Sequence, residues 1–226
     1  LDKMDVSPLH FAADAEQGVT DALSDGRLIH SCVLELPLYE ATTCTWQGGV
    51  TAKGEPSMSR NTTDYKKFKA QMSALGREEI SANKDWLCRR IRHAVLEHPV
   101  AGQMVAEAQA ELSVFWTHPI GIECKSRLDL LCRDKFVADL KTAADITPDG
   151  FGRAAHRYGY HTQGSFYQDA ARALTGRVLP YYIVACEKVE PFDVAVYELP
   201  DAILDIGRAK YCANLRKVKE CRASGN

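Results

Sequence analysis

The sequence predicts an α/β fold in which helices flank a central mixed β-sheet. Three observations predict it. Apolar residues recur at helical spacing through much of the first hundred residues, three strand-like patterns then follow one another, and two further strands come after a long helical stretch. A chain of 226 residues can bury a real core, so we expect a single domain over 1–226.

The first part of the chain, residues 1–108, is predicted to be mainly helical. A segment at about 42–64 is rich in Gly, Ser and Thr and is expected to form a long loop, which in a compact domain is usually functional or disordered. Around it, we expect helices over 8–24, 26–35, 64–74, 77–97 and 100–108.

The second part, residues 109–226, carries the strand patterns. Gly176 ends a long predicted helix, because glycine is the usual residue just past a helix C-terminus. The final helix is basic. The expected elements are strands over 110–116, 122–132 and 135–142, a helix over 149–175, strands over 180–188 and 192–199, and a helix over 201–221.

The composition excludes several classes of protein. No apolar run approaches the roughly 18 residues that span a membrane. Eight cysteines occur without any CxxC pair, which predicts free thiols in a reducing cytoplasm instead of a disulfide scaffold or a zinc site. The net charge of −2 gives no general attraction to nucleic acid. Basic residues nevertheless cluster over 64–70, 86–95 and 214–222, although such a cluster is often a solvated helix face.

Two carboxylates and a lysine are predicted to meet on the hairpin formed by 122–132 and 135–142. Asp139 and Lys141 leave the same face of their strand, since side chains alternate, and the short turn can bring Asp129 beside Asp139. Paired carboxylates bind a hard divalent cation, and a nearby ammonium group suits phosphodiester hydrolysis. A salt-bridged hairpin is the alternative, and D-x-K by itself is a weak signal.

The same stretch resembles a known superfamily. RLDLLCRDKFVADLKT is similar to motifs II and III of the PD-(D/E)xK nucleases, in the form D-x₉-D-x-K. GRLIHSCVLE resembles the histidine motif of RecB-like nucleases, and YHTQGSFYQDA resembles the helix after the catalytic strand in the same families. The nearest relatives look like the RecE type (exonuclease VIII) and the phage lambda type of alkaline exonuclease. The resemblance implies a restriction-endonuclease-like core.

The resemblance also implies roles for individual residues. Asp129 and Asp139 match the two metal-binding carboxylates and Lys141 the catalytic lysine. The backbone carbonyl of Leu140 matches a further metal ligand.

Two more candidate ligands come from the resemblance. Glu111 sits where lambda-type enzymes place another acid near the metals, and its alternative role is an edge-strand charge. His30 matches the RecB-type histidine ligand, although a histidine on an apolar helix face can simply be packed. The implied cofactor is Mg²⁺, and an imidazole ligand would make Mn²⁺ a possible substitute.

Three residues are candidates for DNA contact. Gln163 and Tyr167 lie one helical turn apart, and the resemblance implies that they hold the DNA backbone near the metals; ordinary helix packing is the alternative. Ser7 matches a serine near a phosphate pocket at a helix start, where helix N-termini attract phosphate. Simple capping of the helix also explains Ser7.

The implied function is a Mg²⁺-dependent exodeoxyribonuclease that digests double-stranded DNA ends. By resemblance it would be processive and 5′→3′, would leave 3′ overhangs for a single-strand annealing protein in phage-type recombination, and would form a ring of three subunits around DNA. Two alternatives stay open: a PD-(D/E)xK endonuclease of the restriction or junction-resolving kind, and a non-catalytic DNA-binding module of the same fold.

Overall fold

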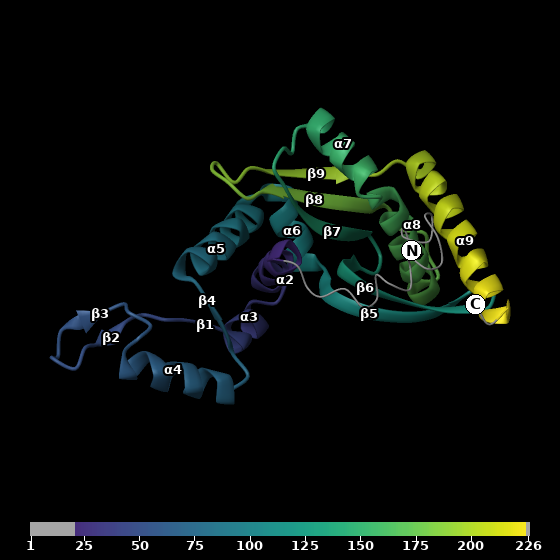
Figure 1. Ribbon diagram of the computed structural model, residues 1–226. Helices are drawn as coiled ribbons and strands as arrows, with labels where there is room; N and C mark the ends of the chain where they lie inside the picture. The colour runs from purple at the N-terminus through teal and green to yellow at the C-terminus, as the bar shows by residue number, and fades with distance from the viewer. Residues whose placement is uncertain (1–20, 225–226) are drawn as a thin grey trace.

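The structure, a computed structural model, describes residues 21–224 of the chain (Figure 1). Ser7 and most of the helix expected over 8–24 lie outside the described residues. The main sheet has five strands in the order β5-β6-β7-β8-β9. These strands are β5 (Gln109–His118), β6 (Ile122–Cys132), β7 (Phe136–Ala143), β8 (Tyr181–Glu187) and β9 (Val194–Glu198).

The sheet is mixed. Its neighbouring strands are antiparallel except for β7 and β8, which run parallel. A parallel pair needs a crossover connection, and here two helices supply it. They are α7 (Pro148–Arg157) and α8 (Tyr160–Thr175). Side chains of β6 and β7 pair in the register Leu130↔Ala138, so continuing that register would set Asp129 opposite Asp139.

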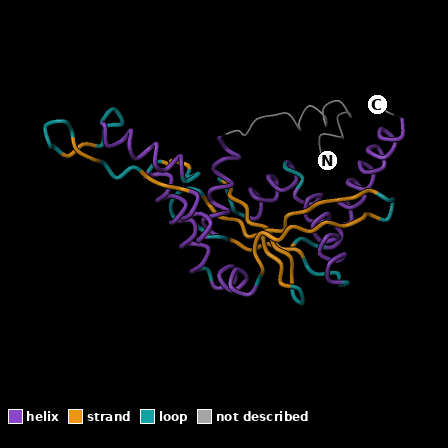
Figure 2. The backbone as a smooth tube through the Cα atoms, turned by 90° about the horizontal axis from the view of Figure 1, so that it is seen from below, coloured by secondary structure: helices purple, strands orange, loops and turns teal. Residues whose placement is uncertain are grey.

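Helices cover both faces of the sheet (Figures 1 and 2). On one face, α2 (Asp21–Leu34), α5 (Ala82–Glu97) and α6 (Pro99–Glu107) pack on apolar side chains of β6, β7 and β8. On the other face, α7 and α8 pack together with α9 (Asp201–Ser224). The predicted class, a central mixed sheet flanked by helices, is therefore confirmed.

Local sequence signals explain where several of these helices begin. The Ser81 hydroxyl accepts a hydrogen bond from the amide of Lys84 and starts α5. Thr147 does the same for α7, and Pro148 follows at a helical position that needs no amide donor. α8 begins right after Gly159 and ends at Gly176, both in the left-handed region.

Residues 36–80 differ from the prediction. The expected loop at 42–64 contains three short strands, and the helix expected from 77 begins only at Ala82. Residues 78–80 instead form a strand that runs parallel to 43–45. The elements are α3 (Leu36–Thr42), β1 (Thr43–Thr45), β2 (Gly49–Val50), β3 (Pro56–Ser57), α4 (Thr63–Ala74) and β4 (Glu78–Ile80).

The helix expected over 149–175 is also broken. Gly159 has φ 67°, which interrupts the helical hydrogen bonding and separates α7 from α8. Glycine adopts this conformation without the steric cost that other residues meet. As predicted, the eight cysteines form no disulfide. Among the helices that the structure describes, none is both long and apolar enough to span a membrane.

Candidate metal and phosphodiester site

Three side chains with metal-binding atoms converge at one end of the sheet. His30 on α2, Glu111 on β5 and Asp129 on β6 each offer a ligand atom, and these atoms lie within 4.8 Å of one another. His30 Nδ1 is 3.3 Å from an Asp129 oxygen and 3.8 Å from a Glu111 oxygen. The structure thus brings together three residues separated by up to about a hundred positions in the sequence, all of which the sequence analysis had selected.

Glu111 reaches the cluster through an unusual backbone conformation. Its φ is 52°, and the β5–β6 ladder pairs Ala110 with Leu130 and Leu112 with Leu128 but omits Glu111. A non-glycine residue in this region costs on the order of 1–3 kcal/mol, and such outliers gather at functional sites. Arg127 holds the side chain, with its Nε 2.5 Å from a Glu111 oxygen.

Asp129 sits where β6 and β7 separate. One of its oxygens accepts a hydrogen bond of 2.9 Å from the backbone amide of Leu140, so the side chain replaces a strand partner. The carboxylate is nearly buried, and no ion pair neutralises it except the contact with His30 among the described residues. Burial, together with the nearby charge of Asp139, raises the pKa of Asp129 to about 7.

Asp139 and Lys141 form an ion pair on the same strand, as the alternation of β7 predicted. Asp139 is 1% exposed and also accepts a hydrogen bond of 3.1 Å from the amide of Gln163 on α8. The Lys141 ammonium lies 5.1 Å from the centre of the Tyr160 ring. Gln163 therefore contacts the second carboxylate directly in this structure.

Burial and neighbouring charges shift the pKa values of Lys141, His30 and Glu111. Burial on its own would lower the pKa of Lys141, but Asp139 and Asp129 raise it above its ordinary value. Burial opposes charge on His30 as well, and its bond with Glu111 and the carboxylates of Asp129 and Asp139 still raise its pKa. For Glu111, burial would raise the pKa, and the contact with His30 and the charge of Arg127 lower it.

These groups open into a polar cleft of about 800 Å³. Tyr167 lines the cleft, whereas Asp139 and Gln163 are not among its lining residues. The selected residues that line the cleft are His30, Glu111, Asp129, Leu140, Lys141 and Tyr167. The other residues of the cleft were not candidates from the sequence, among them Glu35, Arg127 and Tyr160. Arg127 also bonds to Glu35, which lies between α2 and α3, and no local pattern reveals this contact.

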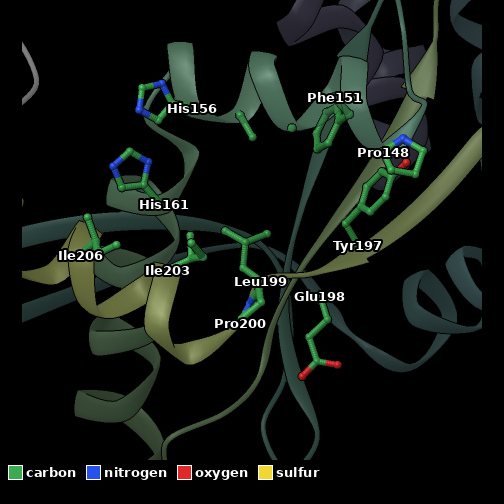
Figure 3. Close-up of a pocket in the computed structure, with 12 residues that line it drawn as sticks. Pro148, Phe151, His156, His161, Tyr197, Glu198, Leu199, Pro200, Ile203 and Ile206 are labelled. Atoms are coloured by element: carbon green, nitrogen blue, oxygen red, sulfur yellow. The ribbon is translucent and has the colours of Figure 1, made fainter.

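A second hollow, of about 460 Å³, differs in character (Figure 3). It lies between α7, the end of β9 and the start of α9, and mainly apolar side chains such as Phe151, Leu199 and Ile203 point into it. His156 and His161 stack at its edge, with ring centres 6.2 Å apart. Its one carboxylate, on Glu198, accepts a hydrogen bond from the Tyr182 hydroxyl. The polar cleft, where several acids and a lysine gather, is the better candidate for a catalytic site.

The donor set of the cleft fits a divalent metal ion. Two carboxylates and an imidazole at mutual ligand distance are hard and intermediate donors that suit Mg²⁺ or Mn²⁺. Asp139 contributes a third carboxylate nearby, although Lys141 and Gln163 occupy its oxygens in this structure.

The mixed sheet, together with acids from adjoining strands and a lysine two residues after the second acid, defines a PD-(D/E)xK-type domain. Over residues 1–226 the chain matches the family described as a PDDEXK-like domain of unknown function (DUF3799), and it belongs to that family. None of the curated proteins compared with the chain matches it significantly.

Several solved structures are similar to this chain. A proposed exonuclease from Eubacterium rectale has a TM-score of 0.62 at 19% sequence identity, covering 92% of this chain and 70% of its own. An alkaline exonuclease from Laribacter hongkongensis (LHK-Exo) matches with a TM-score of 0.35 at 15% identity, covering 71% of this chain and 82% of its own. The first likeness supports the fold, and the second is too distant to add to it. Family and fold together place the chain among nuclease-type domains.

Proposed function

We propose that this protein is a Mg²⁺-dependent exodeoxyribonuclease that acts on the ends of double-stranded DNA, with Mn²⁺ as a possible substitute. The observation that carries the proposal is the convergence of His30, Glu111 and Asp129 in a cleft that Lys141 also lines. This set combines ligands for a hard cation with a fixed positive charge. Metal-assisted phosphodiester hydrolysis uses both.

The metal would be held by His30, Glu111 and Asp129, with Asp139 and the Leu140 carbonyl as further proposed ligands. A divalent ion bound there lowers the pKa of water and offsets charge on the phosphate oxygens. Strain at Glu111 and the bond from Arg127 keep one ligand in place before any substrate arrives. Such preorganisation reduces the reorganisation needed during the reaction.

Lys141 would act as a charged hydrogen-bond donor and not as a general base. Because the surrounding carboxylates raise its pKa, it stays protonated at neutral pH and is unsuited to act as a general base. It can donate hydrogen bonds to the attacking water or to a phosphate oxygen, and so stabilise charge that develops there. Gln163 fixes the partner carboxylate, Asp139, and Tyr167 on the cleft wall is our candidate for contact with the DNA backbone.

The finer activity rests on resemblance to RecE-type and lambda-type exonucleases. We propose processive 5′→3′ digestion that leaves 3′ overhangs, for use by a single-strand annealing protein in recombination. A closed ring of three subunits would keep the enzyme on its substrate. Ser7, outside the described residues, is a candidate for contact with a terminal phosphate.

A comparison of linear and circular duplexes in Mg²⁺ tests the proposal. We expect loss of the linear duplex only, and no loss of either in EDTA. Digestion of both would indicate an endonuclease, and digestion of neither would indicate a DNA-binding module without activity. A duplex labelled at one 5′ end then gives the polarity, because 5′→3′ digestion releases the label as a mononucleotide at the earliest times.

A further inference from the structure

Residues 43–80 form an extension that we call the arm. The arm leaves the body beside α3 and projects away from the five-stranded sheet (Figures 1 and 2). The parallel pair of β1 and β4 forms its base. Thr43, Gly76 and Glu78, which belong to this base, also line the polar cleft. The surface of the arm is therefore continuous with the candidate catalytic site.

The arm has its own internal packing. Trp46 contacts Tyr65 and Phe68 of α4, with ring centres 5.4 Å and 5.1 Å apart. The Asp64 carboxylate accepts a hydrogen bond of 2.9 Å from the amide of Val50, which ties α4 to the hairpin of β2 and β3. These contacts give the arm a defined shape before a ligand binds, so docking on it loses less conformational entropy.

The arm's acidic side chains are mostly occupied within the protein. Glu78 pairs with Arg27 at 2.5 Å, and Glu79 pairs with Arg60 at 2.9 Å while also accepting a bond from Tyr65. Asp64 is bound to the backbone, as described above. Of the arm's four carboxylates, only the exposed Glu55 has no such partner among the described residues.

The arm's lysines, in contrast, face solvent. Lys66, Lys67 and Lys69 are exposed on α4, and none makes an ion pair within the described part of the chain. Tyr65 and Phe68 occupy the inner face of the same helix, so the lysines lie on its outer side and flank. With Lys53 near the tip, they give the arm an excess of uncompensated positive charge in a chain whose net charge is −2.

We propose that the arm binds the phosphate backbone of duplex DNA outside the catalytic cleft, through Lys66, Lys67 and Lys69. The proposal rests on the proposed function, because the duplex that enters the cleft is the ligand. Charge complementarity favours a polyanion, and continuity with the cleft places that polyanion beside the arm. Lysines without acidic partners can each neutralise a phosphate, and binding of this kind is independent of sequence.

A variant with Lys66→Ala, Lys67→Ala and Lys69→Ala tests the arm. Binding of a fluorescent 40-base-pair duplex is measured in EDTA over a range of salt concentrations, so that cleavage does not interfere. Each lost phosphate contact reduces the log–log slope of affinity against salt by about 0.9. We expect the slope to become shallower by roughly two to three, and the affinity at 0.1 M salt to fall about tenfold or more.

A matched control removes the same charge elsewhere. Arg133, Lys188 and Arg222 are exposed and lie outside the arm. Their combined replacement by alanine should leave the slope within about half a unit of the wild type, since they lie after β6, after β8 and in α9, away from the arm and the cleft lining. Circular dichroism checks that both variants are folded. An unchanged slope in the arm variant, or equal losses in both variants, overturns the proposal.

A separate measurement on the wild type keeps the two proposals distinct. Hydrolysis of bis(p-nitrophenyl) phosphate in Mg²⁺ reports on the cleft with a small substrate that needs no contact with Lys66, Lys67 or Lys69. If the wild type hydrolyses this diester but the salt slope of the triple-lysine variant is unchanged, the role of the arm is rejected and the proposed function stands. A wild type that neither hydrolyses this diester nor binds the duplex would overturn both.

Discussion

Asp129 and Asp139 belong to one hairpin but have different surroundings. Asp139 is paired with Lys141 and held by Gln163, whereas Asp129 faces His30 and a backbone amide. Burial and the neighbouring charge of Asp139 disfavour the charged form of Asp129. A bound cation would favour that charged form.

Asp139→Ala and Lys141→Ala should each abolish cleavage while leaving duplex binding largely intact. Because the ion pair is buried, each replacement should also lower the free energy of unfolding. Loss of a charged group that stabilises the transition state removes several kcal/mol, on the order of a hundredfold or more in rate. Single-turnover digestion of a labelled linear duplex measures this. A variant that keeps more than about a tenth of the wild-type rate would contradict the assigned roles.

His30→Ala should reduce activity less than loss of either carboxylate, and high Mn²⁺ should restore part of it. The imidazole is one of three clustered donors, so its removal weakens metal binding that mass action can refill. Activity is titrated against Mg²⁺ and Mn²⁺. Wild-type behaviour at low Mg²⁺ would mean that His30 is a packed residue and not a ligand.

The placement of the candidate residues Asp139 and Lys141 could be predicted, because alternation along one strand sets it without knowledge of distant contacts. Asp129 needed only a short hairpin in addition. His30 and Glu111 were selected by resemblance, since nothing local shows that α2 and the start of β5 lie beside Asp129. Arg127 and Tyr160 were not identified as cleft residues, because their contacts depend on side chains from elements distant in the sequence.

At the scale of elements, strands and capped helices with strong patterns were predicted closely. β6 spans Ile122–Cys132, as expected. The errors fall where tertiary context decides: β4 is three residues long and exists through pairing with β1, which local periodicity does not reveal. The break before α8 depends on the left-handed conformation of Gly159. A single glycine inside a helical pattern does not by itself predict such a break.

Two glycine replacements should have opposite effects on stability. Gly159→Ala forces a side chain into φ 67° and should lower the free energy of unfolding by about 1 kcal/mol. Gly152→Ala, inside α7 with no atom within 4 Å of the added carbon, should raise it by roughly 0.5–1 kcal/mol. Denaturant unfolding of the two variants beside the wild type measures both. Equal shifts of the same sign would contradict this account of the helix break.

At the scale of the whole molecule, a net charge of −2 gives little long-range attraction to DNA. Phosphate contacts alone therefore hold a monomer weakly as salt rises, even with a basic arm. Enclosure in a ring would separate two steps: starting on an end would be sensitive to salt, and continued digestion of a threaded duplex would not.

We accordingly predict a closed homo-oligomer, a trimer by resemblance, that continues digestion after unlabelled trap DNA is added. Light scattering gives the assembly, and gel analysis of products after the trap gives the run length. A monomer at working concentration, or digestion that stops within a few nucleotides of trap addition, would refute the ring. The nuclease proposal would survive either result, because it depends on the cleft that His30, Glu111, Asp129 and Lys141 line and not on assembly.

The distance along the chain between His30 and Asp129 has a consequence for folding. An ion held by both would close a loop of about a hundred residues, and cross-links across long loops restrict the unfolded chain most. Metal would then act as a staple between α2 and the sheet, and would stabilise the native state in proportion to the logarithm of its concentration over its dissociation constant. We expect Mn²⁺ to raise the melting temperature of the EDTA-treated wild type, and to raise it much less in Asp129→Asn. Calorimetry of the two proteins with and without Mn²⁺ measures the difference, and equal shifts would show that the ion binds elsewhere.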